Sequence, residues 1–113
     1  MRHRDKTTLK KILVAIEEAT EVFGDVSRET FLTSRTLKLA MAMSVIRVGE
    51  LVKALTPEFR RDNPQVPWRD IAGYRDVAAH KYETLDFNGL YVTSKEEFPE
   101  LKLQIEKILS ECD

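Results

Sequence analysis

The sequence predicts an all-α protein, built as an up-and-down bundle of four main helices joined by short helical turns. Apolar residues recur every three or four positions in four segments, the spacing that gathers them on one face of a helix. Glycine and proline punctuate the stretches between these segments. The length of 113 residues suits a single domain, here residues 1–113.

The first helix is expected over residues 5–23. Asp5 has the short polar side chain that caps helix N-termini, and Gly24 ends the helix. Its apolar positions share one face and are Leu9, Ile12, Leu13, Ile16, Ala19 and Phe23. Residues 27–32 are expected to form a short turn, capped by Ser27 and directing Phe31 inward.

The second main helix, over residues 34–55, carries more apolar surface than one core face needs. One seam runs in steps of four and three through Leu37, Met41, Ser44, Val48, Leu51 and Leu55. A further apolar set comprises Leu39, Ala40, Met43, Val45, Ile46 and Val52. With about four helices available, we interpret the excess as a homodimer interface. The alternative is a core formed wholly within one chain.

Three prolines, at positions 57, 64 and 67, bar a continuous helix through the connector at residues 56–67. Pro67 then starts the third main helix, which extends to Tyr82, at a position where its missing N–H does no harm. The expected buried stripe of this helix comprises Trp68, Ile71, Tyr74, Val77 and Ala78. Gly49 and Gly73 lie inside helices, where glycine costs about 1 kcal/mol relative to alanine. A close approach of two helix backbones would explain both.

Residues 83–95 read as a loop, with a short helical turn around residues 87–91. The last helix is expected from residue 95 or 96 to residue 111, with Pro99 tolerated in its first turn. Its core-facing residues are Phe98, Leu101, Ile105, Ile108 and Leu109.

Charge is unevenly distributed along the chain. Residues 1–82 hold 15 Lys and Arg against 11 Asp and Glu, whereas residues 83–113 hold 3 against 8. This pattern favours one local site for a polyanion over a broad nucleic-acid surface. The sequence shows no apolar run that would cross a membrane and no signal peptide, and its single cysteine, Cys112, fits a reducing compartment. We therefore expect a cytoplasmic protein.

One stretch of eight residues contains Arg75, His80 and Tyr82. Their side chains provide the chemical groups needed to bind and cleave a phosphodiester. Arginine carries a planar charge that matches phosphate oxygens. Histidine exchanges a proton near neutral pH, and the tyrosine hydroxyl can contact phosphate or be modified. The alternative is that this trio, common at helical spacing, is only structural.

Helical geometry limits how these side chains meet. Arg75 and Tyr82, seven residues apart, would project from nearly the same side, whereas His80 would point roughly 140° from Arg75. Asp76 is four residues from His80 and could orient the imidazole. Either the helix deforms near His80, or a second copy of the chain completes the site, and we favour the second option.

Arg47 and Glu50 are candidate supporting residues. They are three apart on one helix and can form an ion pair. Glu50 could instead brace Arg75 from the neighbouring helix. We rank structural support above direct catalysis for both. No cluster of residues has metal-ligand spacing, so neither a metal nor another cofactor is expected.

From about residue 42 to residue 109 the chain resembles the HepT-like toxins, a branch of the HEPN superfamily. The matching pieces are VGE at residues 48–50, P-x-V-P-W at 64–68, RDVAAHKY at 75–82 and FPELKLQIEKIL at 98–109. The most specific mark is an Arg, a polar residue, three further residues, a His, any residue and a Tyr.

This resemblance implies a helical bundle that dimerises, with the Arg and His motifs lining a cleft at the interface. It implies a metal-independent endoribonuclease that serves as the toxin of a type VII toxin–antitoxin system. It also implies a partner, a minimal nucleotidyltransferase antitoxin that attaches AMP to the motif tyrosine. By position, these roles fall on Arg75, His80 and Tyr82, with Asp76 as the polar residue.

The chain departs from the family pattern at two places. Asp76 stands where Asn is common, which puts an anion close to the proposed phosphate site, and Tyr91-Val92 stands where an aromatic residue, often Trp, is usual. A rival function from another class is a non-catalytic helical binding partner of a minimal nucleotidyltransferase. That reading predicts a tight complex and no cleavage of RNA.

Overall fold

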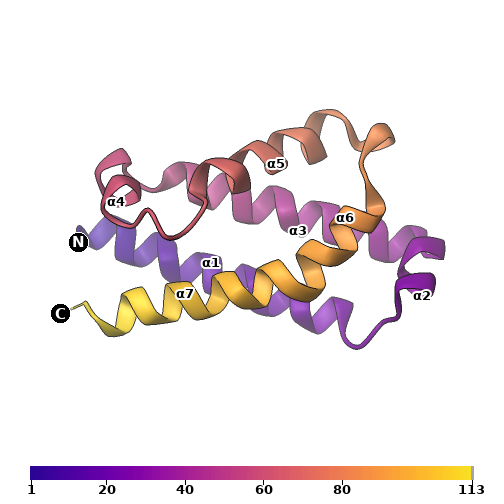
Figure 1. Ribbon diagram of the computed structural model, residues 1–113, viewed down its shortest axis with the longest axis horizontal. Helices are drawn as coiled ribbons and strands as arrows, with labels where there is room; N and C mark the ends of the chain where they lie inside the picture. The colour runs from indigo at the N-terminus through magenta and orange to yellow at the C-terminus, as the bar shows by residue number, and fades with distance from the viewer. Residues whose placement is uncertain (113) are drawn as a thin grey trace.

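The computed structural model describes residues 1–112, and every regular element in them is helical (Figure 1). The long helices are α1 (His3–Phe23), α3 (Arg35–Ala54), α5 (Trp68–His80) and α7 (Phe98–Ser110). The short ones are α2 (Arg28–Thr33), α4 (Pro57–Asp62), α6 (Phe87–Val92), a 3-10 turn η1 (Tyr82–Thr84) and a π-helical turn η2 (Thr93–Glu97). The prediction of an all-α chain is confirmed.

The long helices run back and forth along a molecule 44 Å long, and both termini lie at the same end (Figure 1). α3 packs against α1 on one side and against α5 on the other, while α7 packs against α1. α2 contacts α3 and α6 at the end far from the termini. None of the helices in residues 1–112 is long and apolar enough to cross a membrane.

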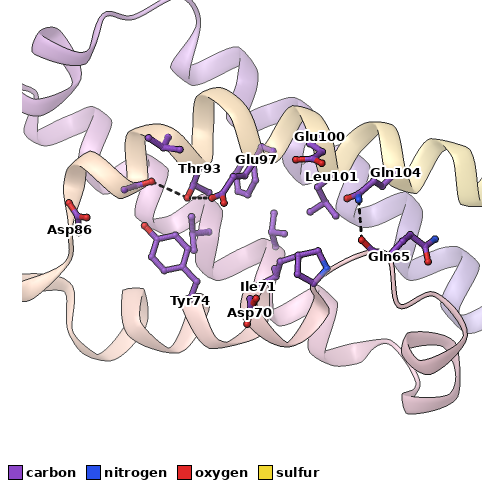
Figure 2. A pocket seen from close by; sticks show the side chains of 16 residues that line it. Gln65, Asp70, Ile71, Tyr74, Asp86, Thr93, Glu97, Glu100, Leu101 and Gln104 are labelled. Carbon is purple, nitrogen blue, oxygen red and sulfur yellow. Dashed lines mark hydrogen bonds between the residues drawn. The ribbon is translucent and has the colours of Figure 1, made fainter.

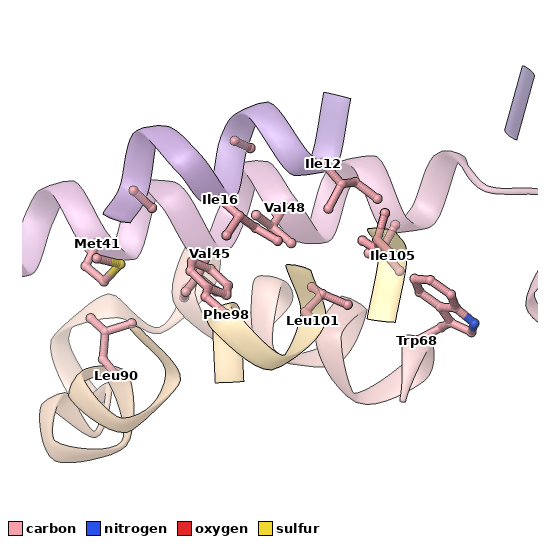
Figure 3. Close-up of a cluster of buried hydrophobic side chains, with 14 of the residues drawn as sticks. Ile12, Ile16, Met41, Val45, Val48, Trp68, Leu90, Phe98, Leu101 and Ile105 are labelled. Atoms are coloured by element: carbon pink, nitrogen blue, oxygen red, sulfur yellow. The ribbon is translucent and has the colours of Figure 1, made fainter. Parts of the chain in front are cut away.

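The hydrophobic core lies between α1, α3 and α7 (Figure 3). Along α3 and its C-cap residue, the core residues follow one another in steps of four and three: Met41, Val45, Val48, Val52 and Leu55. Val45 and Val52 therefore belong to the core of the chain, and their assignment to a dimer surface is wrong.

Of the rest of this excess apolar set, Ile46 is partly buried against the core, whereas Leu39 and Met43 are exposed. Leu39 is 49% exposed and Met43 is 62% exposed. On α1, Val14 and Val22 are exposed to a similar degree.

Asp5 has a different role from the helix cap that the sequence predicted. α1 begins at His3, two residues earlier, and Asp5 is a buried residue with 1% of its surface exposed. Its carboxylate accepts hydrogen bonds from Thr56 N at 2.8 Å and Thr56 Oγ1 at 2.7 Å. Because Thr56 is itself the N-cap of α4, Asp5 ties the start of the connector to α1.

Trp68 anchors the start of α5 in the core, as predicted. It is 4% exposed, its ring lies 5.7 Å from that of Phe59, and its Nε1 donates a hydrogen bond to Asn63 O at 2.9 Å. The expected buried stripe is wrong at Val77, which is 40% exposed, whereas Ala78 is buried.

The expected loop after Tyr82 is largely helical. The short turn around residues 87–91 is confirmed as α6, but η2 joins it directly to α7. Thr93 and Ser94 donate hydroxyl hydrogen bonds to the carbonyls of Gly89 and Leu90, four residues earlier. Pro99 has no N–H for the carbonyl four residues before it, and the wider π turn lies just upstream of that break.

Tyr91 has a packing role at the far end of the molecule. Its ring centroid lies 5.4 Å from that of Phe23 and 5.7 Å from that of Phe31, and its hydroxyl donates to Val26 O at 3.2 Å. The aromatic position that departs from the family pattern is thus part of the core packing.

Candidate active site

The candidate site is built where α3 and α5 cross. A Cβ added at Gly49 would overlap Arg75 Cβ and would lie 2.7 Å from Arg75 Cγ and 3.3 Å from Ile71 O. The predicted close approach of two helices is therefore confirmed for Gly49, because only a residue without a side chain lets α5 come this near. It is wrong for Gly73, which is exposed and has no atom within 4 Å of an added Cβ.

This crossing places the Arg75 guanidinium among carboxylates. Arg75 Nε lies 2.5 Å from Glu50 Oε1, although its N–H is not aligned as a hydrogen bond. Arg75 Nη1 donates to Asp76 Oδ1 at 3.2 Å. The side chain of Arg75 is 20% exposed, so the guanidinium is held firmly but still reaches solvent. The expected contact between Glu50 and Arg75 is present.

Lys53 is a member of this network that the sequence analysis missed. Lys53 Nζ donates to Asp76 Oδ1 at 2.6 Å, so one carboxylate oxygen joins two cations. The hydrogen bond from Lys53, together with that from Arg75, lowers the pKa of Asp76 below its ordinary value. Asp76 therefore stays ionised further into the acidic range than a free aspartate. Lys53 follows Glu50 by three positions on α3, and this spacing is the signal that could have found it.

His80 is the last residue of α5, and its side chain is exposed. The Asp76 carboxylate is engaged by Lys53 and Arg75, so the expected orientation of the imidazole by Asp76 is wrong. Within residues 1–112, the imidazole forms no hydrogen bond or ion pair and is free to meet a ligand.

Residues 75–80 are helical throughout, and Lys81 N still bonds to Val77 O at 2.8 Å. The helix does not deform between Arg75 and His80. Five residues of α-helix turn these two side chains roughly 140° apart. One copy of α5 therefore does not bring the guanidinium and the imidazole to the same face.

Tyr82 does not share a face of α5 with Arg75, which corrects the expectation from helical spacing. The helix ends at Lys81, with φ −133° and ψ 38°, and Tyr82 begins the turn η1. The Tyr82 ring packs edge-on against Phe87, with centroids 5.5 Å apart. Its hydroxyl has no hydrogen-bond partner among the described residues and is not buried.

Arg47 lies apart from this network. Its guanidinium contacts Glu18 of α1, with Nη1 2.9 Å from Oε2, so the expected pairing with Glu50 is wrong. Arg47 fastens α3 to α1, and Glu50 is left for Arg75.

Comparison with known proteins decides which family this site belongs to. The family model described as Ribonuclease HepT-like matches residues 12–108, most of the chain. The chain belongs to the HepT-like ribonuclease family. The resemblance seen in residues 42–109 is thereby confirmed, and with it the assignment to ribonucleases as a class of enzyme.

The relatives of this HepT-like chain described next match 89% to 100% of its length. A protein of Thermococcus cleftensis named "Probable ribonuclease HepT" is 33% identical over 96% of this chain and 98% of its own. One of Methanocaldococcus jannaschii named "Putative RNase" is 31% identical over 100% of this chain and 98% of its own. Another "Putative RNase", of Caldanaerobacter subterraneus, is 37% identical over 89% of this chain and 90% of its own. No solved structure matches the chain significantly.

The arrangement in this HepT-like chain offers a fixed cation and a free imidazole. Arg75 supplies a positive charge braced by two carboxylates, and His80 supplies a proton carrier in contact with solvent. Among residues 1–112, no group of three or more His, Cys, Asp and Glu side chains is placed to hold a metal ion.

Proposed function

We propose that this chain is the toxin of a type VII toxin–antitoxin pair, a metal-independent endoribonuclease that acts in the cytoplasm as a homodimer. The observation that carries the proposal is the geometry of α5. A braced Arg75 and a free His80 point to different sides of one straight helix. Two protomers that pair through this region would bring the imidazole of each toward the guanidinium of the other.

In the proposed reaction the RNA supplies its own nucleophile. The ribose 2′ oxygen attacks the adjacent phosphorus, and the bond from phosphorus to the 5′ oxygen of the next nucleotide breaks. At each site the His80 of one protomer takes the proton from the 2′-hydroxyl, and solvent water gives a proton to the leaving 5′ oxygen. Arg75 stabilises the negative charge that grows on the phosphoryl oxygens.

The network around Arg75 prepares it for this role. Glu50 and Asp76 fix the guanidinium from two sides, and Lys53 offsets the charge of Asp76. The anion that distinguishes this chain from the family pattern is thus paired with two cations before RNA arrives. We infer that Asp76, Glu50 and Lys53 position Arg75, and that Arg47 supports α3 through Glu18.

The dimer proposal draws support from surface that the core leaves uncovered. Leu39 and Met43 remain exposed on α3. Side chains of this size are ordinarily covered when several of them lie on one surface. The proposed assembly is two up-and-down bundles of four main helices.

The products of the reaction test the proposed function. RNA incubated with the purified protein in EDTA should yield fragments that end in a 2′,3′-cyclic phosphate and begin with a 5′-hydroxyl, because the 2′ oxygen is the nucleophile. End-group analysis by mass spectrometry reads this directly. Fragments with 5′-phosphates would contradict the proposed chemistry.

Tyr82 is proposed as the point of inhibition by a minimal nucleotidyltransferase antitoxin. Its free hydroxyl would attack the α-phosphate of ATP, pyrophosphate would leave, and the phenolic proton would pass to solvent or to a base of the transferase. The added phosphate brings negative charge next to the motif and would repel an RNA backbone. The observation that supports this is the unbonded hydroxyl on η1.

Co-expression with such a transferase should add one or more AMP increments to the intact mass of the chain. The increment should disappear in Tyr82→Phe and persist in Tyr91→Phe, whose hydroxyl is already bonded to Val26 O. An unmodified wild-type chain, or an increment that survives Tyr82→Phe, would refute the assignment.

A non-catalytic binding partner of a nucleotidyltransferase is the second candidate. The net charge of −1 and the carboxylates beside Arg75 favour it, because both weaken attraction for RNA. It predicts a tight complex with the transferase and no RNA cleavage at any protein concentration, so the product analysis separates the two functions.

A further inference from the structure

A groove separates α5 from the run of α6, η2 and α7 (Figure 2). Neither Glu50 nor Arg75 is among the residues that line it. It has a volume of about 640 Å³, within the range of small-molecule sites. Its apolar lining comprises Val45, Val48, Pro67, Ile71, Val92, Phe98 and Leu101. At one end Gln104 Nε2 donates to Gln65 O at 3.3 Å and joins the two walls.

The charged side chains of this groove all carry the same sign. Its lining contains Asp70, Asp86, Glu97 and Glu100, and it contains no lysine or arginine. The carboxylates come from both walls, since Asp70 lies on α5 and Glu97 and Glu100 lie on η2 and α7. Such a surface attracts cations and repels a phosphate backbone.

The same negative surroundings affect the pKa of Tyr74. Burial is the largest cause that raises the pKa of Tyr74, and a contact with Thr93 offsets part of this effect. The negative charges of Asp86 and Glu97 raise the pKa further.

Tyr74 also presents an unused polar atom to the groove. Its hydroxyl points toward Thr93 and Glu97 (Figure 2). The Tyr74 Oη atom is buried and has no hydrogen-bond partner of good geometry within residues 1–112. The single hydroxyl hydrogen of Thr93 is shared between Glu97 Oε1, 2.7 Å from Oγ1, and Gly89 O, 3.1 Å from it. A ligand N–H near this point would satisfy the phenol oxygen and a carboxylate together.

We propose that the groove binds a small linear polyamine, an aliphatic chain with two or more ammonium groups. One ammonium donates to Tyr74 Oη and to Glu97. The aliphatic chain lies on the apolar lining formed by residues such as Ile71 and Leu101, and a further ammonium is held by Asp70 or Glu100. A primary ammonium offers three donors, which match several acceptors on a lining that provides no competing cation.

Spermidine added to the full chain without RNA tests this site, by calorimetry and by backbone amide shifts. Saturable binding is expected, with shifts concentrated at α5 near Tyr74 and at residues 93–101. Glu97→Gln and Tyr74→Phe should each weaken binding about tenfold or more, because the first removes the negative charge that pairs with the ammonium and the second removes an accepting oxygen. The matched control is Glu106→Gln, an exposed residue of α7 outside the groove with the same change of charge, and it should leave binding unchanged.

Two further probes distinguish a polyamine site from general surface attraction and from a site for a protein partner. Hexaamminecobalt(III) has the charge without the aliphatic chain and should not reproduce the groove shifts. If Glu106→Gln weakened spermidine binding as much as the groove variants do, or if the cobalt complex caused the same shifts, binding would reflect general attraction to the negative surface. Either result would overturn the proposal. It would also fail if a lysine-containing peptide shifted the groove while spermidine did not, since the groove would then dock a protein. None of these measurements depends on RNA cleavage.

Discussion

His80→Ala is expected to lower RNA cleavage by about 10²- to 10⁴-fold, the usual contribution of a positioned acid or base. The loss should come without a loss of stability, because the imidazole is exposed and makes no hydrogen bond or ion pair within residues 1–112. Cleavage of a labelled RNA under single-turnover conditions gives the rate. Thermal unfolding followed by circular dichroism checks that the fold is unchanged.

The matched control for this prediction is His3→Ala, which removes the other histidine of the chain. His3 is also exposed and lies at the start of α1. It has no place in the proposed reaction, so cleavage by His3→Ala should equal that of the wild type. Undiminished cleavage by His80→Ala would remove His80 from the mechanism.

Gly49→Ala is expected to destabilise the fold by about 1–3 kcal/mol, the usual cost of overpacking. The new methyl group would overlap Arg75 Cβ, which cannot swing aside as the end of a flexible side chain would. α5 must therefore move away from α3, and the contact between Arg75 and Glu50 would loosen with it. Cleavage should fall as well. Urea denaturation measures the free energy of unfolding.

Gly73→Ala is the control that separates the effect of the clash with Arg75 from the effect of replacing a helical glycine with alanine. Gly73 lies on α5, and an added Cβ there meets no atom within 4 Å. This variant should gain about 0.5–1 kcal/mol, because alanine loses less backbone entropy in a helix than glycine does. Opposite signs for the two substitutions are the expected result, and an equal gain for both would contradict the packing of α3 on α5.

The spacing of apolar residues and the capping residues along the sequence were sufficient to predict much of this fold. The four long helices follow apolar residues at helical spacing, and the capping role of Ser27 and the burial of Phe31 are visible in the sequence. The functional motif was equally accessible, because Arg75, His80 and Tyr82 stand at a recognisable spacing. Such signals lie within a few turns of one helix.

Contacts between distant segments escaped the sequence analysis. Asp5 looked like a helix cap, yet its partner is Thr56, 51 positions away. The engagement of Asp76 by Lys53 depends on how α3 crosses α5, and the end of α5 at His80 moved Tyr82 off the helix. The only sign of the acidic groove in the sequence is the excess of Asp and Glu after residue 82. The groove itself could not be predicted, because its walls come together only in the folded chain.

Complementation between two inactive variants tests the central claim that each catalytic site draws residues from both protomers. Arg75→Ala and His80→Ala chains, unfolded together and refolded as a mixture, should recover about a quarter of the wild-type cleavage rate. Random pairing makes half of the dimers mixed, and each mixed dimer has one intact site of two. A mixture that stays as inactive as the separate variants would contradict a site shared between protomers.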